Sequence, residues 1–404
     1  MIVKAADPEE YEAISEMVER ANNHSTLEST IIQATTREDP AFQKGDLRVV
    51  KVDGTIVGMA MLIRRPIRIG TALVKGALVA PVATHPDHQR KGYCSAVMKN
   101  LIQYMQTQGL ELSLLWGIPW LYPRYGYSPA MVKTELVIKP QQSASVETGP
   151  YESRPFKEAD VPQITHIYHQ NTATKTCAEV RAPTMWTWKP RSSTVTLEVV
   201  INTEGDVRGY FALGTDWGRP CAHEIGVQDE EACRDIWNRL LDTAQKKKLK
   251  EFVCLLHPSH PFTRFALHQN GEIRIRSEGG AGMARVLNLG PLLTTMEKEW
   301  TRRLSASALH GIECTLTIAS GGQSAVFDIT HGQVSVRETG TKSDYQLDTP
   351  LECLNPLITG YKTISEIATN PQVNVKGGKR AMHLLDVLFP TRLPFGGHLP
   401  LFWE

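Results

Sequence analysis

The feature of the sequence that most restricts its fold is an apolar run that passes through a short polar turn into an amphipathic helix. Residues 76–84 (G-A-L-V-A-P-V-A-T) are apolar enough for a central strand, and the turn H-P-D-H-Q-R-K-G occupies 85–92. Apolar residues then recur on one helix face, at Cys94, Val97, Met98, Leu101, Ile102 and Met105. A further strand is predicted at 112–116, so this region indicates an α/β unit.

The turn at 85–92 has the properties of an anion-binding site. The first N–H groups of a helix have no acceptor within the helix, and the helix dipole places positive charge at the same end. Gly92 lets the backbone approach a phosphate closely, and Arg90 and Lys91 add charge. The alternative is a surface turn with two solvated cations, because short glycine motifs match many unrelated sequences.

A second segment repeats the order of the first. Residues 1–138 are predicted to contain a helix that starts at Asp7-Pro8, a hairpin and the unit described above. The matching helix, hairpin, strand, helix and strand of the second copy are predicted at 160–171, 196–213, 222–227, 230–247 and 251–256. In place of the glycine turn this copy has Asp229, Glu230 and Glu231, which would repel an anion.

The regions outside the two repeats differ in composition. Residues 139–155 are polar and rich in Ser, Pro and Gly, so a linker is expected there. From about residue 287, the sequence predicts a helix at 292–305 and then strands separated by glycine turns. The last residues are apolar, and we expect this tail to be docked rather than exposed to water.

Composition excludes several classes of protein. The chain has 404 residues, enough for two or three domains, and its net charge of +1 lacks the basic field that bulk nucleic-acid binding needs. The acidic N-terminus does not resemble a signal peptide, and no window reaches the ~18 apolar residues of a membrane helix. The seven cysteines show no C-x-x-C pair. We therefore expect a cytoplasmic protein with neither nucleic acid nor membrane as its partner.

The turn resembles a known cofactor loop. It lacks the glycine patterns of dinucleotide folds and P-loops. The pattern V-x-T-H-P-D-x-Q-R-K-G-x-x-S-x-x-M resembles the acyl-CoA loop of the GNAT superfamily of N-acetyltransferases, which reads [Q/R]-x-x-G-x-[G/A] between a strand and a helix. Gln89, Gly92 and Cys94 occupy its three defined positions. Cys94 replaces the usual Gly or Ala, a change that tightens the pocket but keeps the N–H donor.

The whole chain is similar to one branch of that superfamily. The three-part layout, the segment Y-P-R-Y-G-Y-S-P-A at 122–130 and the aromatic terminus resemble the Eis-type ("enhanced intracellular survival") family. This resemblance implies an α/β (α+β) fold with tandem GNAT-like mixed-sheet domains and a sterol-carrier-protein-like α+β domain. The expected domains are a catalytic one at 1–150, a second GNAT-like one without a CoA loop at 151–286, and the third at 287–404 with the docked tail.

The resemblance also implies which residues bind the co-substrate, acetyl-CoA. Backbone groups of Val82, Ala83 and Thr84 would pair with the pantetheine arm and hold the thioester carbonyl. Tyr122 and Pro123 would lie beside the thiol. The N–H groups expected to surround the pyrophosphate are those of Arg90, Lys91, Gly92, Tyr93, Cys94 and Ser95.

The same resemblance assigns an acid and a base. Tyr127 would return a proton to the departing thiolate, and the C-terminal carboxylate of Glu404 would accept the proton of the amine, with the tail buried in the first domain's active site. A primary amine attacks the acetyl carbonyl directly, so no enzymatic nucleophile is needed. An α-carboxylate is ionised at pH 7, since its reference pKa is about 3.5. The family commonly ends in Phe, so both carboxylates of Glu404 are candidate bases.

The implied acceptor is a primary amine, either an aminoglycoside-like polyamine or a lysine side chain, and no metal is implied. The family is also homo-oligomeric, as a hexamer. Glu28, in the N-H-S-T-L-E-S-T segment, is a candidate for acceptor recognition, with a solvated loop acid as the alternative. A function of another class stays open: a non-catalytic acyl-CoA or lipid-binding sensor or carrier, with an apolar cavity at residues 292–404.

Several side chains fit a second interpretation. Tyr127 also fits a buried core tyrosine. Cys94 at a helix start fits an acyl-carrying nucleophile, although an apolar helix-facing cysteine is usually a packing residue. Trp116 and Trp120 fit either an acceptor pocket or the core.

The turn also contains residue types that bind metals. His85, Asp87 and His88 are metal-ligating residue types within H-P-D-H, but no third ligand of the usual kind lies nearby in the sequence. Loop polarity is the favoured interpretation, and we expect no metal there.

Overall fold

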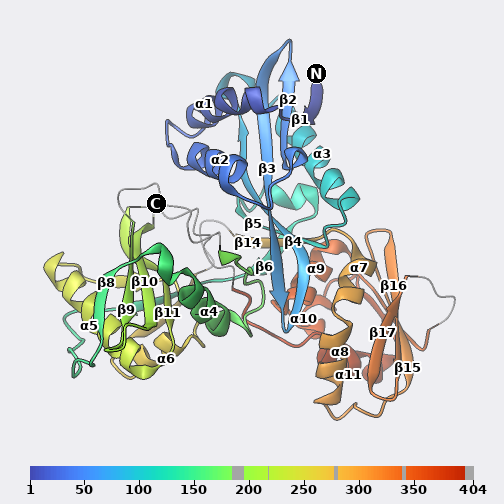
Figure 1. Cartoon of the computed structure of the whole chain (residues 1–404). Coiled ribbons are helices and arrows are strands. Elements are labelled where there is room, and N and C mark those ends of the chain that lie inside the picture. Colours follow the sequence, from blue (N-terminus) through green and yellow to red (C-terminus); the bar gives the residue numbers. More distant parts are fainter. Residues whose placement is uncertain (184–194, 217, 277–280, 339–342, 396–404) are drawn as a thin grey trace.

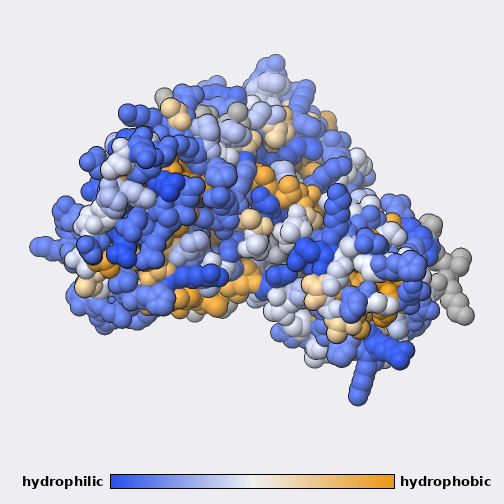
Figure 2. Space-filling model, turned by 60° about the horizontal axis from the view of Figure 1, so that its bottom comes forward, coloured by the Kyte–Doolittle hydropathy of each residue, from blue (hydrophilic) through white to orange (hydrophobic). Residues whose placement is uncertain are grey.

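Three mixed β-sheets with covering helices make up the protein (Figure 1). The computed structural model describes residues 1–183, 195–216, 218–276, 281–338 and 343–395. In these ranges no helix is long and apolar enough to cross a membrane. The surface seen in Figure 2 is mainly hydrophilic and is interrupted by separate apolar areas. The mixed α/β class predicted from the sequence is confirmed.

The first sheet has seven strands in the order β1-β2-β3-β4-β5-β14-β6. Their bounds are β1 Ile2–Ala5, β2 Leu47–Val52, β3 Thr55–Ile69, β4 Ala72–Thr84, β5 Leu112–Gly117, β6 Ser128–Met131 and β14 Ala281–Val286. Helices α1 (Tyr11–Ala21) and α2 (Leu27–Glu38) pack on one face, over Val49 and Met59, and α3 (Tyr93–Thr107) packs on the other. Residues 57–63 of β3 are all buried, because successive side chains point to opposite faces of the sheet and both faces are covered.

The second sheet has the order β13-β7-β12-β11-β10-β9-β8. The strands are β7 Lys133–Ile138, β8 Glu152–Pro155, β9 Thr196–Ile201, β10 Val207–Asp216, β11 Arg219–Val227, β12 Phe252–Cys254 and β13 Glu272–Arg276. The helices are α4 Val161–Thr172, α5 Glu230–Lys246 and α6 Pro261–Leu267. The expected linker at 139–155 is therefore partly wrong, because β8 pairs in register with β9.

The two sheets match strand for strand and exchange one strand each. Read from β1 and from β8, the orders correspond, with β4 matching β11 and β5 matching β12. The position next to β5 holds β14, which follows the second repeat in the sequence. The position next to β12 holds β7, which follows the first repeat. The expected boundary at residue 150 thus leaves β7 with the first domain although it belongs to the second sheet. The boundary at 286 leaves β14 with the second domain although it belongs to the first sheet.

The third sheet has the order β17-β16-β15-β18-β19. These strands are β15 Cys314–Ser320, β16 Gln323–Thr330, β17 Gln333–Arg337, β18 Tyr345–Asp348 and β19 Asn374–Lys376. The helices are α7 Leu289–Thr295, α8 Glu297–Ser305, α9 Leu351–Thr359, α10 Ile364–Ile367 and α11 Gly378–Leu388. The single helix expected at 292–305 is two helices that meet at Met296, whose ψ of 4° departs from the helical value. The likeness of this domain to a sterol carrier stays a prediction.

The third domain is bonded directly to the first. Asn355 on α9 accepts the N–H of Val286 at 2.9 Å and donates to the carbonyl of Gly126 at 3.0 Å. In its own core the Trp300 ring lies 5.8 Å from the ring of Phe327 and 5.0 Å from that of Phe389. One apolar cluster continues from this core to β5, β6 and β14 of the first sheet. The third domain therefore supports the strands that end at the candidate site.

Candidate active site

The candidate site begins where two parallel strands separate. β4 and β5 pair only through Gly76–Leu112, Ala77–Ser113 and Leu78–Leu114. Beyond that point β4 continues to Thr84 and β5 to Gly117 without pairing with each other. β4 stays paired with β3 and β5 with β14, so the separation leaves a wedge-shaped gap between two strands that are each fixed on their outer side.

The backbone of Val82, Ala83 and Thr84 forms one wall of this wedge. Their outer edge pairs with β3, where Ala60, Met59 and Gly58 are the respective partners. The edge toward β5 has no strand partner in the described part of the chain. An extended ligand with amide groups can therefore pair with β4 as a strand would.

The turn after β4 presents a set of backbone donors. Gly92 has φ of +85° and caps α3, and the first helical bond runs from the N–H of Ala96 to its carbonyl at 3.0 Å. Among the described residues, the N–H groups of 90–95 find no acceptor in the chain. A Cβ at Gly92 would touch nothing within 4 Å, so the positive φ, and not crowding, requires glycine.

The charged side chains of the turn are exposed. Arg90 and Lys91 lie at the surface, and the Lys91 ammonium donates to the carbonyl of Asp87 at 3.0 Å. The turn thus combines free N–H donors, a helix start and two cations, which suits a pyrophosphate. The structure brings together the six residues expected there, Arg90, Lys91, Gly92, Tyr93, Cys94 and Ser95.

The half-buried Cys94 lies in the first turn of α3. Burial raises the pKa of its thiol, although a hydrogen bond with Tyr125 acts in the opposite direction. A nucleophilic cysteine needs a lowered pKa to form its thiolate. The environment of Cys94 therefore favours packing over the acyl-carrying role.

Tyr122 and Pro123 begin a short 3₁₀ helix, Tyr122–Tyr125, directly after β5. A Cβ on Gly117 would lie 2.2 Å from the Tyr122 ring, so glycine is needed for the ring to cover the end of the strand. Burial and, secondarily, the neighbouring Cys94 and Tyr125 raise the pKa of Tyr122 to about 12. Tyr122 therefore stays protonated at neutral pH.

Tyr127 lies at the closed end of the wedge. Its hydroxyl is 2.7 Å from the hydroxyl of Ser113, which belongs to the last paired residues of β4 and β5. The side chain is only 1% exposed, and its ring meets Tyr122 edge-on with centroids 6.2 Å apart. Burial raises the pKa of Tyr127 above its usual range, against the hydrogen bond to Ser113 and the charge of Arg285.

Two residues of this site were not predicted. Ser113 is a polar residue within the apolar strand L-S-L-L-W, a signal that sequence analysis could have used. Arg285 lies on the exchanged strand β14 and donates to the carbonyl of Tyr125 at 2.5 Å. Its place beside the tyrosines follows from strand exchange, which no local pattern indicates.

Glu28 lies on a helix and not on the expected loop. It is in the first turn of α2, because the segment after His24 starts a helix at Leu27 that packs against α1. Glu28 is half-buried, and its Oε2 is buried without a hydrogen-bond partner in the described chain. The neighbouring Ser29 instead donates to Glu19 at 2.5 Å.

The structure describes the two predicted tryptophans but not the end of the tail. Trp116 and Trp120 are 41% and 66% exposed, so they do not belong to the core. Glu404 and the aromatic end of the tail lie outside the described residues. The segment before them is held between the first two domains, because Phe395 donates to the carbonyl of Thr176 at 2.9 Å and Val132 donates to Pro394 at 3.1 Å.

The histidines of the turn are close to each other. The rings of His85 and His88 meet edge-on at 5.4 Å. Within the described ranges, no three His, Cys, Asp or Glu side chains are grouped to hold a metal ion.

The separating strands and the helix start suit a ligand that pairs with β4 and places a pyrophosphate at the turn. Comparison with known families agrees, since residues 3–130 match the family described as "Acetyltransferase (GNAT) domain". Residues 3–130 therefore form a GNAT acetyltransferase domain. Such domains use acetyl-CoA as co-substrate. No curated protein sequence matches the chain.

Solved structures share the architecture of the whole chain. A GCN5-related N-acetyltransferase from Anabaena variabilis ATCC 29413 has a TM-score of 0.74 at 16% identity, covering 97% of this chain and 98% of that one. A probable N-acyltransferase of unknown function from Enterococcus faecalis V583 has 0.74 at 15%, covering 95% and 96%. Eis1 from Mycobacterium abscessus has 0.67 at 17%, covering 98% and 100%. At these identities the likeness concerns the fold.

Proposed function

We propose that this protein transfers the acetyl group of acetyl-CoA to a primary amine by direct attack. The observation that carries the proposal is the alignment of three features along one path. The donor turn at 90–95 lies at the open end of the wedge, the unpaired edge of β4 follows, and Tyr127 lies at the closed end. A ligand with a pyrophosphate, an amide-containing arm and a reactive thioester matches that order.

Tyr127 is proposed as the acid that protonates the departing thiolate. The amine nitrogen forms a bond to the acetyl carbon, the carbon–sulfur bond breaks, and sulfur receives the tyrosine proton. The high pKa of Tyr127 keeps this proton in place at pH 7. It also makes the group a weak acid toward a solvated thiolate, but a thiolate inside the same apolar wedge has a raised pKa as well. Ser113 fixes the direction of the hydroxyl.

The C-terminal carboxylate of Glu404 is proposed as the base that accepts the amine proton. Support comes from the anchored segment before the tail, which is bonded to Val132 next to β6. Nine residues follow Phe395 in the sequence. The acceptor is proposed to be an aminoglycoside-like polyamine or a lysine side chain, and the assembly a hexamer, as the family resemblance implies.

The test is thiol release from acetyl-CoA with a panel of primary amines. We expect Tyr127→Phe to lower kcat by about 10²–10⁴-fold while acetyl-CoA still binds. Tyr151→Phe is the matched control, since its hydroxyl also donates to a polar group, Asp229 at 3.3 Å, but in the second domain. Deletion of Trp403 and Glu404 is expected to abolish turnover as well.

Each other outcome has a distinct meaning. Tight acetyl-CoA binding with no turnover on any amine would replace the enzyme by a sensor or carrier. Turnover that survives the tail deletion would remove Glu404 from the mechanism and keep the transferase. Equal rates for wild type and Tyr127→Phe would return Tyr127 to a packing role.

A further inference from the structure

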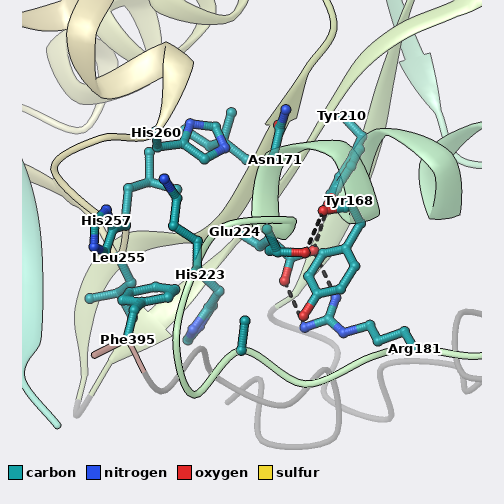
Figure 3. Close-up of a pocket in the computed structure, with 15 residues that line it drawn as sticks. Tyr168, Asn171, Arg181, Tyr210, His223, Glu224, Leu255, His257, His260 and Phe395 are labelled. Atoms are coloured by element: carbon teal, nitrogen blue, oxygen red, sulfur yellow. Dashed lines mark hydrogen bonds and ion pairs between the residues drawn. The ribbon is translucent and has the colours of Figure 1, made fainter. Parts of the chain in front are cut away.

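The second domain has a cavity at the position that corresponds to the candidate active site. β11 and β12 pair only through Cys221–Val253 and Ala222–Cys254, and β11 then continues to Val227. The cavity lies in this separation, with His223 and Ile225 on the β11 side and Leu255 and His257 after β12. Figure 3 shows His257, His260 and Phe395 on one side and an ion cluster around Arg181 on the other.

The cavity is not a second CoA site. At the start of α5 the side chain of Asp229 accepts the N–H of Ala232 at 2.9 Å, which occupies a donor that a phosphate would need. Glu230 and Glu231 add negative charge in the same turn. The strands of the second domain therefore separate as those of the first do, but the helix start repels a nucleotide.

Lys175 is the unusual group in the cavity wall. It is 8% exposed, and its ammonium contacts only the hydroxyl and the carbonyl of Ser259, both uncharged. Within the described residues no carboxylate lies within 4 Å of it. A buried ammonium without an anion is unfavourable, and burial together with the charge of Arg264 lowers its pKa.

The other charges of the wall are already compensated. The Arg181 guanidinium contacts Glu179 at 2.9 Å and Glu224 at 2.8 Å, and the Tyr210 hydroxyl donates to Glu224 at 2.8 Å. This cluster brings two acids to one arginine, so it offers no cation to a ligand. Lys175 is thus the cation of the lining that has no acidic partner in the described chain.

The histidines of the lining are uncharged at neutral pH. Burial, followed by the charge of Lys175, lowers the pKa of His257 to about 4 and of His260 to about 3. In both rings Nδ1 accepts a backbone N–H, from Ser259 at 3.0 Å and from Phe262 at 3.2 Å. The remaining proton is therefore on Nε2, which in His257 is donated to the carbonyl of Leu393 at 3.1 Å.

Size and polarity limit the occupant. The cavity volume is about 40 Å³, which corresponds to about three or four non-hydrogen atoms at roughly 10–15 Å³ for each water-sized group. Ile225, Leu255 and Phe395 provide apolar surface beside the single uncompensated ammonium. A carboxylate with a short alkyl group fits both properties.

We propose that the cavity between β11 and β12 binds a carboxylate of the size of acetate, which has four non-hydrogen atoms, through Lys175. One carboxylate oxygen accepts from the Lys175 ammonium, and the alkyl group faces Leu255 and Phe395. This site is separate from the candidate active site and does not depend on its proposed chemistry.

The experiment is equilibrium dialysis of the full chain with radiolabelled acetate in the absence of CoA. We expect saturable binding to one site, and competition by unlabelled acetate but not by the neutral acetamide. Lys175→Met removes the charge with little change in shape and should weaken binding by at least about tenfold. Lys247→Met, at an exposed lysine of the same domain, is the matched control.

A second variant covers the possibility that Lys175→Met does not fold. Ala178→Leu keeps Lys175 and fills the cavity, because Ala178 is buried in its wall, and it should also lose acetate binding. Wild-type binding that is absent, equal for acetamide, or unchanged in both variants would overturn the proposal. Displacement of acetate by CoA would assign the binding to the first domain and would overturn it as well.

Discussion

The first two domains share one strand order and use the same separation of parallel strands differently. In the first domain the wedge between β4 and β5 opens toward a glycine turn with free N–H groups. In the second, the equivalent helix start is capped by Asp229, and the space holds a buried ion cluster and Lys175. The backbone scaffold thus provides a place for a ligand, and a few residues at the turn decide which chemistry it accepts.

The largest effect is expected from breaking the ion cluster of the second domain. Arg181→Met removes the shared partner of the buried Glu179 and the partly buried Glu224, so the free energy of unfolding should fall by about 3–5 kcal/mol. Urea unfolding followed by circular dichroism measures this change. A change below about 1 kcal/mol would mean that the cluster contributes little to the fold.

A substitution in the glycine turn of the first domain should change acetyl-CoA binding more than it changes the free energy of unfolding. Gly92→Val forces a β-branched residue to φ of +85° at the donor turn, and we expect KM for acetyl-CoA to rise by about tenfold or more. Gly54→Val is the matched control, because Gly54 also has φ of +85° with nothing within 4 Å and lies in the β2–β3 turn. If both variants raise KM equally, strain and not pyrophosphate contact explains the effect.

The contact between the first and third domains should make the stability of the protein depend on pH. Glu299 accepts from the Thr71 hydroxyl at 2.8 Å and pairs with Arg302 and Arg303. Burial alone would raise its pKa, but these partners lower it to about 2. Its contribution to stability is therefore complete above its unfolded pKa, about 4.5, and is lost as pH falls toward 2.

Glu299→Gln tests this junction. The variant should be less stable than wild type by about 2 kcal/mol at pH 7, and the difference should shrink between pH 4 and pH 2. Thermal unfolding of both proteins over this range measures it. A difference that is independent of pH would show that the carboxylate charge is not what stabilises the contact.

The smallest effect is expected at the capped turn of the second domain. Asp229→Ala removes the acceptor for the N–H of Ala232 and should cost about 1 kcal/mol of stability. It should create no second CoA site beside that of the first domain, since Glu230 and Glu231 remain. Isothermal titration with CoA measures the stoichiometry, and a second equivalent bound by the variant but not by wild type would show that the cap alone blocks the second domain.

Much of the fold was predictable because its signals are local. The spacing of apolar residues gave α3 and α5 within about one residue, and the hairpin of β9 and β10 followed from Glu204-Gly205. The turn at 90–95 was predictable for the same reason, since its donors depend on a strand, a glycine and a helix that are adjacent in sequence. Helix α2 was missed because it has the weaker amphipathic pattern of a helix that packs mainly on α1.

The sequence by itself determined much of the order of strands and helices, the glycine turn and the difference in charge between the two repeats, because each depends on neighbouring residues. Only the tertiary structure decided which strand completes each sheet. It also placed Arg285 against Tyr125, joined Tyr127 to Ser113 and buried Lys175 without an acid. These contacts join residues far apart in the chain, and their energy depends on packing and burial that no local pattern encodes.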